Sequence, residues 1–176
     1  MEQVILVDDA DRAIGVAEKV AAHRECVRHR AFSVWVVSPS GDLLLQRRHA
    51  SKYHTGGLWT NACDGHPRPG EDLAAAAARR LGEEMGLSCS LEHLYAFTYE
   101  ARFDDGLTEC EYDHVYLGVF AGDPAPDPAE VADWRWVRPE DLARAVAERP
   151  EAYAVWTRLA LPQVLAHLDG APPAER

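Results

Sequence analysis

The sequence has no long apolar run, and its uninterrupted apolar stretches are short, as at residues 74–78. A helix that crosses a bilayer needs about 20 consecutive, predominantly apolar residues, so the sequence predicts no such helix. The first nine residues also lack the basic start and the long apolar stretch of a secretory signal peptide. We therefore expect a protein that does not insert into a membrane.

Basic residues are also scarce. The chain has 18 Lys and Arg against 29 Asp and Glu, a formal net charge of −11 at pH 7. Bulk attraction to nucleic acid or to an anionic membrane surface is unfavourable for such a chain. An anionic ligand would have to be bound by local basic groups or by metal ions.

Paired cysteines are missing as well. The four cysteines, Cys26, Cys63, Cys89 and Cys110, are scattered and form no Cys-x-x-Cys motif. A dense cysteine framework is typical of small secreted domains, and this pattern instead predicts free thiols. We therefore expect a cytoplasmic protein.

The 176 residues, of which 47% are hydrophobic, suit a single domain spanning residues 1–176, with a loose tail at about 170–176. β-Branched and aromatic residues predict strands at residues 31–37, 93–103, 111–120 and 134–137, and the turn residues at 38–41 predict that residues 43–47 form the returning strand of a hairpin. Helices are predicted at residues 71–85, 139–148 and 152–168, and a proline-rich loop at 123–128. This mixture predicts an α+β fold in the form of an α/β/α sandwich.

The strongest motif begins at Gly65 and resembles the Nudix box. Its positions are filled by Gly65, Glu71, Arg79, Leu81, Glu83, Glu84, Gly86 and Leu87. One position departs, because Arg80 stands where a glutamate is usual. An amphipathic helix with surface glutamates is the structural alternative. The resemblance implies a Nudix-type α/β/α sandwich with a mixed sheet. Glutamate oxygens on a helix beside a loop suit Mg²⁺ bound to a diphosphate.

Segments around the box resemble type 1 isopentenyl-diphosphate isomerase, a Nudix-fold enzyme family, over residues 18–156. They include Arg47-Arg48, Lys52-Tyr53-His54, Trp59-Thr60-Asn61, Gly65-His66-Pro67 and Glu109-Cys110-Glu111. The resemblance implies interconversion of isopentenyl and dimethylallyl diphosphates. It also accounts for Arg80, because this family has a basic residue at that box position.

The same resemblance implies a metal site with three histidines and two glutamates, here His23, His29, His66, Glu109 and Glu111. Such ligands suit Mg²⁺, Mn²⁺ or Zn²⁺, and imidazole favours a transition metal. Glu109 and Glu111 are two positions apart on a predicted strand, so they face the same way and Cys110 faces the opposite way. The other histidines, at positions 49, 54, 93, 114 and 167, are interpreted as structural or surface residues.

In the family a Mg²⁺ ion also links the substrate diphosphate to a box glutamate and a main-chain carbonyl, which here are those of Glu84 and residue 64. Basic residues that would bind the diphosphate match Lys19, Arg48, Lys52 and Arg80. Aromatic faces suit a carbocation in a dry pocket, and the candidates are Trp59, Tyr99 and Trp156, with Tyr153 as an alternative to Trp156.

The main departure from the family is at the acid/base residue. The family places a cysteine two residues before the His-Pro histidine, and this position is Asp64 here. Cys63 is one place early and would face the opposite way on an extended segment. We interpret Asp64 as one acid/base group and Glu111 as the other, because a desolvated carboxyl can hold a proton near neutral pH. The alternatives are that Cys63 rotates in or that activity is lost.

These features predict a monomeric isomerase that binds a small diphosphate, with Mg²⁺ and a second divalent metal as cofactors. A Nudix hydrolase and a non-catalytic diphosphate-binding protein remain alternatives. Arg80 argues against the hydrolase, because hydrolases commonly use a glutamate at that position to activate water.

Overall fold

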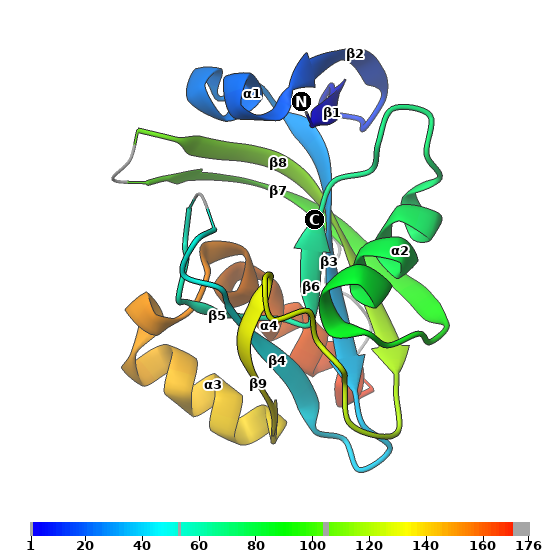
Figure 1. Cartoon of the computed structure of the whole chain (residues 1–176), viewed down its shortest axis with the longest axis vertical. Coiled ribbons are helices and arrows are strands. Elements are labelled where there is room, and N and C mark those ends of the chain that lie inside the picture. Colours follow the sequence, from blue (N-terminus) through cyan, green and yellow to red (C-terminus); the bar gives the residue numbers. More distant parts are fainter. Residues whose placement is uncertain (1, 53, 104–105, 171–176) are drawn as a thin grey trace.

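The computed structural model describes residues 2–52, 54–103 and 106–170 (Figure 1). Its strands are β1 (Gln3–Val7), β2 (Ala13–Glu18), β3 (His29–Val37), β4 (Leu43–Arg48), β5 (Trp59–Thr60), β6 (Cys63–Gly65), β7 (Leu91–Arg102), β8 (Thr108–Val119) and β9 (Val131–Val137). Its helices are α1 (Lys19–Glu25), α2 (Leu73–Met85), α3 (Pro139–Glu148) and α4 (Val155–Leu168), with a 3₁₀ turn at Pro150–Ala152.

Strand β3 organises the sheet, because it pairs with β1, β4, β6 and β8. Its pairing with β8 is parallel and runs from His29 opposite Glu111 to Val37 opposite Val119. Its pairing with β6 is antiparallel and places Ser33 opposite Asp64. The sheet is therefore mixed, as the sequence predicts, and β3 aligns residues that are far apart in the chain.

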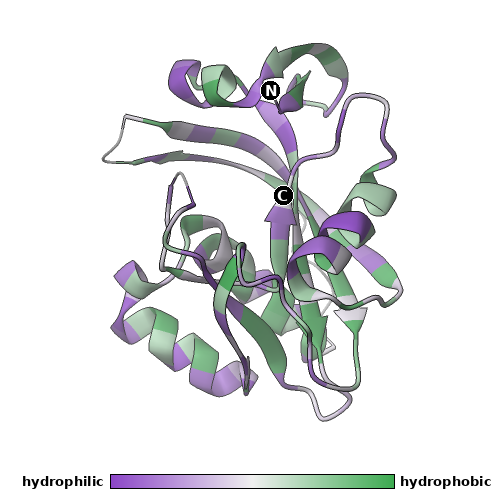
Figure 2. Ribbon diagram, in the orientation of Figure 1, coloured by the Kyte–Doolittle hydropathy of each residue, from purple (hydrophilic) through white to green (hydrophobic). Residues whose placement is uncertain are grey.

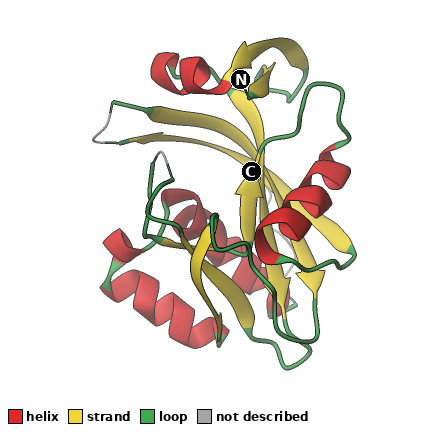
Figure 3. Ribbon diagram, in the orientation of Figure 1, coloured by secondary structure: helices red, strands yellow, loops and turns green. Residues whose placement is uncertain are grey.

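Alternate side chains of β3 face two different helical layers. Phe32, Val34 and Val36 belong to a buried cluster with α2 residues such as Leu81. Trp35 and Val37 belong to a second cluster with residues of α3 and α4. Helices cover both faces of the sheet (Figure 3), and most strands carry apolar residues (Figure 2). The predicted α/β/α sandwich is confirmed.

The predicted helices and long strands are present with small shifts in their ends, and α3 has the predicted bounds. The β1–β2 hairpin, α1 and the short strands β5 and β6 were not predicted from the sequence. Of the predicted loose tail, residues 171–176 lie outside the described residues, and so do residues 104–105, between the predicted strands at 93–103 and 111–120. No helix in the described part of the chain is long and apolar enough to cross a bilayer.

Helix α1 is short but anchored at both ends. The Glu18 side chain accepts a hydrogen bond from the Ala21 amide at 2.9 Å, and Cys26 caps the other end with a left-handed φ of 50°. Cys26 forms a disulfide with Cys110 of β8, with a Cα–Cα distance of 5.3 Å. The expectation of four free thiols is therefore wrong for this pair, whereas Cys63 and Cys89 are free.

Helix α2 carries most of the box. Asp72 caps its N-terminus by accepting a hydrogen bond from the Ala75 amide at 2.9 Å, and Gly86 ends it with φ of 62°. Glu71 precedes the helix and accepts hydrogen bonds from Arg79 at 2.7 and 2.9 Å. This ion pair fastens the loop before α2 to the helix, and it holds the pKa of Glu71 at about 2.

Candidate active site

A cavity of about 890 Å³ is lined by segments from β1 to α4. It gathers all the catalytic, metal-binding and diphosphate-binding residues predicted from the sequence except His23 and His29, together with two of the aromatic candidates. They are Lys19, Arg48, Lys52, Asp64, His66, Arg80, Glu84, Tyr99, Glu109, Glu111 and Trp156. His23 and His29 are fully buried, and one ring nitrogen of each lies within 4.8 Å of ligand atoms of His66 and Glu111.

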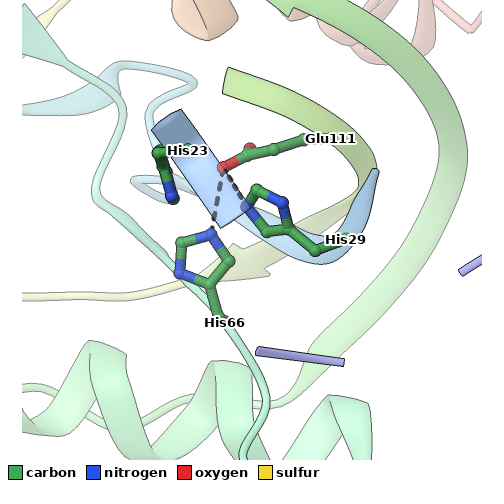
Figure 4. A group of neighbouring side chains, drawn as sticks. All are labelled: His23, His29, His66 and Glu111. Atoms are coloured by element: carbon green, nitrogen blue, oxygen red, sulfur yellow. Dashed lines mark hydrogen bonds and ion pairs between the residues drawn. The ribbon is translucent and has the colours of Figure 1, made fainter. Parts of the chain in front are cut away.

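Four of the predicted metal ligands form a tight cluster. One ligand atom from each of His23, His29, His66 and Glu111 lies within 4.8 Å of the others. The Glu111 carboxylate lies 3.0 Å from His66 Nε2 and 3.5 Å from His29 Nε2 (Figure 4). Helix α1, strands β3 and β8, and the segment after β6 each contribute one of these residues.

Backbone carbonyls fix two of the imidazoles. Nδ1 of His23 lies 2.7 Å from the Lys19 carbonyl oxygen, and Nδ1 of His29 lies 2.8 Å from that of Val27. A carbonyl oxygen only accepts, so both Nδ1 atoms carry the proton and both Nε2 atoms present a lone pair. His29 Nε2 is buried and makes no hydrogen bond. Imidazoles held in this way are typical of metal ligands, and the donor set fits a divalent cation.

The two predicted glutamate ligands, Glu111 in the cluster and Glu109 beside it, differ in their tendency to carry a negative charge. Burial disfavours the Glu111 carboxylate, but the neighbouring His29 and His66 imidazoles hold its pKa well below the usual range. Burial and the neighbouring Glu111 charge raise the pKa of Glu109 well above the usual range. The Tyr99 hydroxyl lies 2.9 Å from Glu109 and 2.7 Å from Glu111, and its single proton serves one of them at a time.

Glu109 is not in the tight cluster. Its Oε1 atom lies 3.1 Å from Nε2 of His54, and the ligand atoms of His23, His54 and Glu109 form a second group within 4.8 Å. The sequence predicts His54 to be a structural or surface residue, whereas the structure places it in the cavity wall. The available signal was its position two residues after Lys52, a predicted diphosphate ligand.

Asp64 projects into the cavity from β6 and is held by two donors. Thr60 donates to Oδ2 at 2.8 Å and the Asn61 amide donates to Oδ1 at 2.7 Å. Burial raises the pKa of Asp64 to about 6, although the Arg48 charge and these hydrogen bonds oppose the rise. A carboxyl with this pKa exchanges protons near neutral pH.

Cys63 faces the other way, as predicted. It lies opposite Val34 in the register, is fully buried, and belongs to the apolar cluster that contacts α2. Burial raises the pKa of its thiol well above the usual range. A thiol in this position is inert, and rotation into the cavity would remove it from the core.

The predicted diphosphate ligands gather at one side of the cavity. Arg80 contacts Glu83 and Glu84, and Lys52 contacts Glu130. Lys19 lies 3.2 Å from Glu2. Arg48 is buried, its guanidinium lies 5.3 Å from the centre of the Trp156 ring, and its buried Nε makes no hydrogen bond. A diphosphate would compete with carboxylates for three of these cations.

Glu84 is the box glutamate that reaches the cavity. Gln46 donates to its Oε2 atom at 2.8 Å and to the Ala62 carbonyl oxygen at 2.8 Å, which fixes the carboxylate. Glu71 does not line the cavity and is paired with Arg79. Of the aromatic candidates, Trp156 and Tyr99 line the cavity, whereas Trp59 and Tyr153 do not.

Comparison with known proteins identifies relatives of this chain. Residues 27–158 match the NUDIX domain family. The chain is 52% identical over 155 residues to an isopentenyl-diphosphate Delta-isomerase of Burkholderia multivorans, covering 88% of each chain. It is 47% identical over 175 residues to isopentenyl-diphosphate Delta-isomerase 2 of Aromatoleum aromaticum, covering 98% of this chain and 93% of the relative.

Solved structures share the fold at low identity. DR0079 from Deinococcus radiodurans is 20% identical with a TM-score of 0.76, covering 92% of this chain and 98% of its own. The NUDIX domain of Shewanella oneidensis NrtR, solved with ADP ribose, is 17% identical with a TM-score of 0.63, covering 79% and 87% respectively. These similarities support the Nudix fold alone.

Proposed function

Because the chain belongs to the isopentenyl-diphosphate Delta-isomerase family within the Nudix superfamily, we propose that it interconverts isopentenyl and dimethylallyl diphosphates. The observation that carries this proposal is the convergence of Asp64 and Glu111 on one cavity beside a group of basic side chains. The family's cysteine is absent from that position, so Asp64 has to supply its function.

The diphosphate would bind at the basic side of the cavity. Lys19, Arg48, Lys52 and Arg80 supply the charges, and Glu84 would hold a Mg²⁺ ion against the phosphate oxygens. A bound divalent cation reverses the sign of the local field, which resolves the conflict between a net charge of −11 and an anionic substrate.

The hydrocarbon end would lie between the two carboxyl groups. One group donates a proton to the terminal alkene carbon, and the other removes a proton from the carbon beside the C–O carbon. The double bond moves by one position and no atom is lost. Asp64 and Glu111 lie opposite Ser33 and His29 on β3, and these two positions face the same side of the sheet. Tyr99 and Trp156 supply aromatic faces for the positive charge that develops between the two proton transfers.

Residues His23, His29, His66, Glu109 and Glu111 would hold a second divalent cation, Mn²⁺, Mg²⁺ or Zn²⁺. Such an ion, when bound, fixes the Glu111 carboxylate and lowers the cost of its negative charge. The residues themselves orient Glu111 through the His29 and His66 contacts and through the Tyr99 hydroxyl.

We also propose that the protein acts as a cytoplasmic monomer.

The hydrolase alternative is less well supported, because the Arg80 guanidinium is paired with the box carboxylates Glu83 and Glu84. It therefore supplies no base for activating water.

Incubation with isopentenyl diphosphate and Mg²⁺ in deuterated water tests the function. Deuterium in dimethylallyl diphosphate is the expected result, whereas released phosphate would indicate a hydrolase. Binding with neither product would indicate a non-catalytic diphosphate-binding protein.

Two single variants test the role of Asp64. Asp64→Asn preserves the volume and can keep one of the two accepted hydrogen bonds, so it should fold but lose about 10²- to 10⁴-fold in turnover. Cys63→Ala should lose stability through its core cavity and retain turnover. If Cys63→Ala alone abolishes isomerisation while remaining folded, the assignment of Asp64 is wrong.

A further inference from the structure

His54 is fixed in the cavity wall rather than mobile at the surface. It lies in the loop between β4 and β5, with 7% of its surface exposed. Its ring stacks on Phe103, with ring centres 4.9 Å apart and planes inclined by 4°. Its Nε2 atom lies 3.1 Å from the Glu109 carboxylate. A buried imidazole aligned on a buried carboxyl requires a chemical explanation.

The hydrogen bonds of Thr55 indicate which nitrogen of His54 carries the proton. The Thr55 hydroxyl donates to the His54 carbonyl oxygen at 2.7 Å, which uses its only proton. Oγ1 of Thr55 also lies 3.1 Å from His54 Nδ1, so it accepts in that contact and Nδ1 donates. The Nε2 lone pair of His54 therefore points at Glu109.

This arrangement matches that of the two fully buried histidines. His23 and His29 also donate from Nδ1 to an oxygen and present Nε2 to the site. A lone pair that faces a carboxyl oxygen at 3.1 Å needs a positive charge between the two atoms, either a proton or a metal cation. The ligand atoms of His23, His54 and Glu109 lie within 4.8 Å of one another, close enough for one cation to contact all three.

We propose that His54 is a sixth ligand of the histidine-rich cation site. The two ligand groups are separate in this structure and share His23, which has one lone pair to offer, so a single ion would have to draw both groups together. Its ligands are His23, His29, His54, His66, Glu109 and Glu111. The inference rests on the cation site that the proposed function uses, and its test requires neither substrate nor catalysis.

A ligand shell of four imidazoles and two carboxylates prefers one class of metal ion over another. Nitrogen ligands favour transition metals, whereas Mg²⁺ prefers oxygen ligands and retains water. Six protein ligands also leave no vacant position in an octahedral shell. The ion at this centre should therefore be a tightly held transition metal, distinct from the Mg²⁺ expected at Glu84.

Titration of the metal-free protein with Co²⁺ tests the proposal, with stoichiometry, affinity and visible spectrum as readouts. We expect one tightly bound Co²⁺ per chain, and X-ray absorption should count four nitrogen ligands. His54→Gln, whose amide can still donate to Glu109, should weaken Co²⁺ binding by at least about 10-fold and remove one nitrogen ligand. His93→Gln, the same change at an exposed histidine, should alter neither.

Unchanged affinity and spectrum in His54→Gln would show that His54 only forms a hydrogen bond, and would overturn the proposal. Two tight Co²⁺ ions per chain in the unsubstituted protein would overturn the single centre. His54→Ala provides a check on folding, because free imidazole should restore its Co²⁺ spectrum if the side chain is a ligand. Failure of the isomerase assay alone would leave these measurements unaffected, so the two proposals fail separately.

Discussion

The disulfide between Cys26 and Cys110 should stabilise the fold by an amount that can be calculated from the length of chain it encloses. It joins residues 84 positions apart, and it connects α1 to β8. In the chain-entropy treatment, a link over about 85 residues removes enough freedom from the unfolded state to stabilise the fold by about 4–5 kcal/mol. Native-state strain and residual structure commonly reduce this to about 2–4 kcal/mol.

The perturbation is the double variant Cys26→Ser/Cys110→Ser, or reduction of the unsubstituted protein by dithiothreitol. Reduction adds two electrons and two protons and yields two thiols. Urea unfolding followed by tryptophan fluorescence should give a free energy of unfolding about 2–4 kcal/mol lower in both cases. Helix α1 should open first, because seven residues cannot form a stable helix without tertiary contacts.

Cys89→Ser serves as the control, because Cys89 is a free thiol and its replacement leaves the link intact. Thiol counting in denaturant is the direct check. Two reactive thiols without reductant and four with it are expected. Four thiols without reductant, or an unfolding free energy that reductant leaves unchanged, would refute the reasoning.

Three further substitutions have predictable outcomes. Glu71→Gln removes the partner of Arg79, and after allowance for solvent screening we expect a loss of about 1 kcal/mol at pH 7. The pKa of Glu71 is lowered to about 2 from 4.5, so this stabilisation is present above about pH 4.5 and disappears as the pH falls to 2. Acid unfolding of the unsubstituted protein and of Glu71→Gln, measured side by side, would reveal the difference. Gln46→Leu removes the donor that orients Glu84, so about 10- to 100-fold more Mg²⁺ should be required for half-maximal activity. An unchanged Mg²⁺ dependence would contradict a positioning role for Gln46. Gly86→Ala places a β-carbon against the Ala125 carbonyl oxygen at a φ of 62°, and thermal unfolding should report a loss of about 2–4 kcal/mol.

Local patterns in the sequence predicted much of the fold. The box helix has a periodic apolar face, an acidic cap and a closing glycine, so its position followed from short-range chemistry. Strand β3 is rich in valine and aromatic residues and is buried on both faces by helices. Helix α1 has only seven residues and depends on Glu18 and Cys26 at its ends, so no periodicity could indicate it.

The site was predictable only where residues matched a spaced motif. Asp64 and Cys63 were placed on opposite faces because neighbouring residues of a strand alternate, and this prediction is confirmed. His54 was missed because its contact with Glu109 joins residues 55 positions apart across an irregular loop. The disulfide was missed for the same reason, because cysteine spacing carries no information on which thiols meet in space.

The parallel alignment of β3 with β8 has a consequence for how the protein reaches its native state. The register sets His29 beside Glu111, although 82 positions separate them in the chain. Pairings between distant segments are formed slowly, because a long loop has to close before any contact compensates for its entropy. The His29–Glu111 contact of the proposed cation site should therefore form only when this pairing is complete. Metal uptake during refolding should lag behind the appearance of helical structure. The time course of metal uptake would therefore report when β3 and β8 pair.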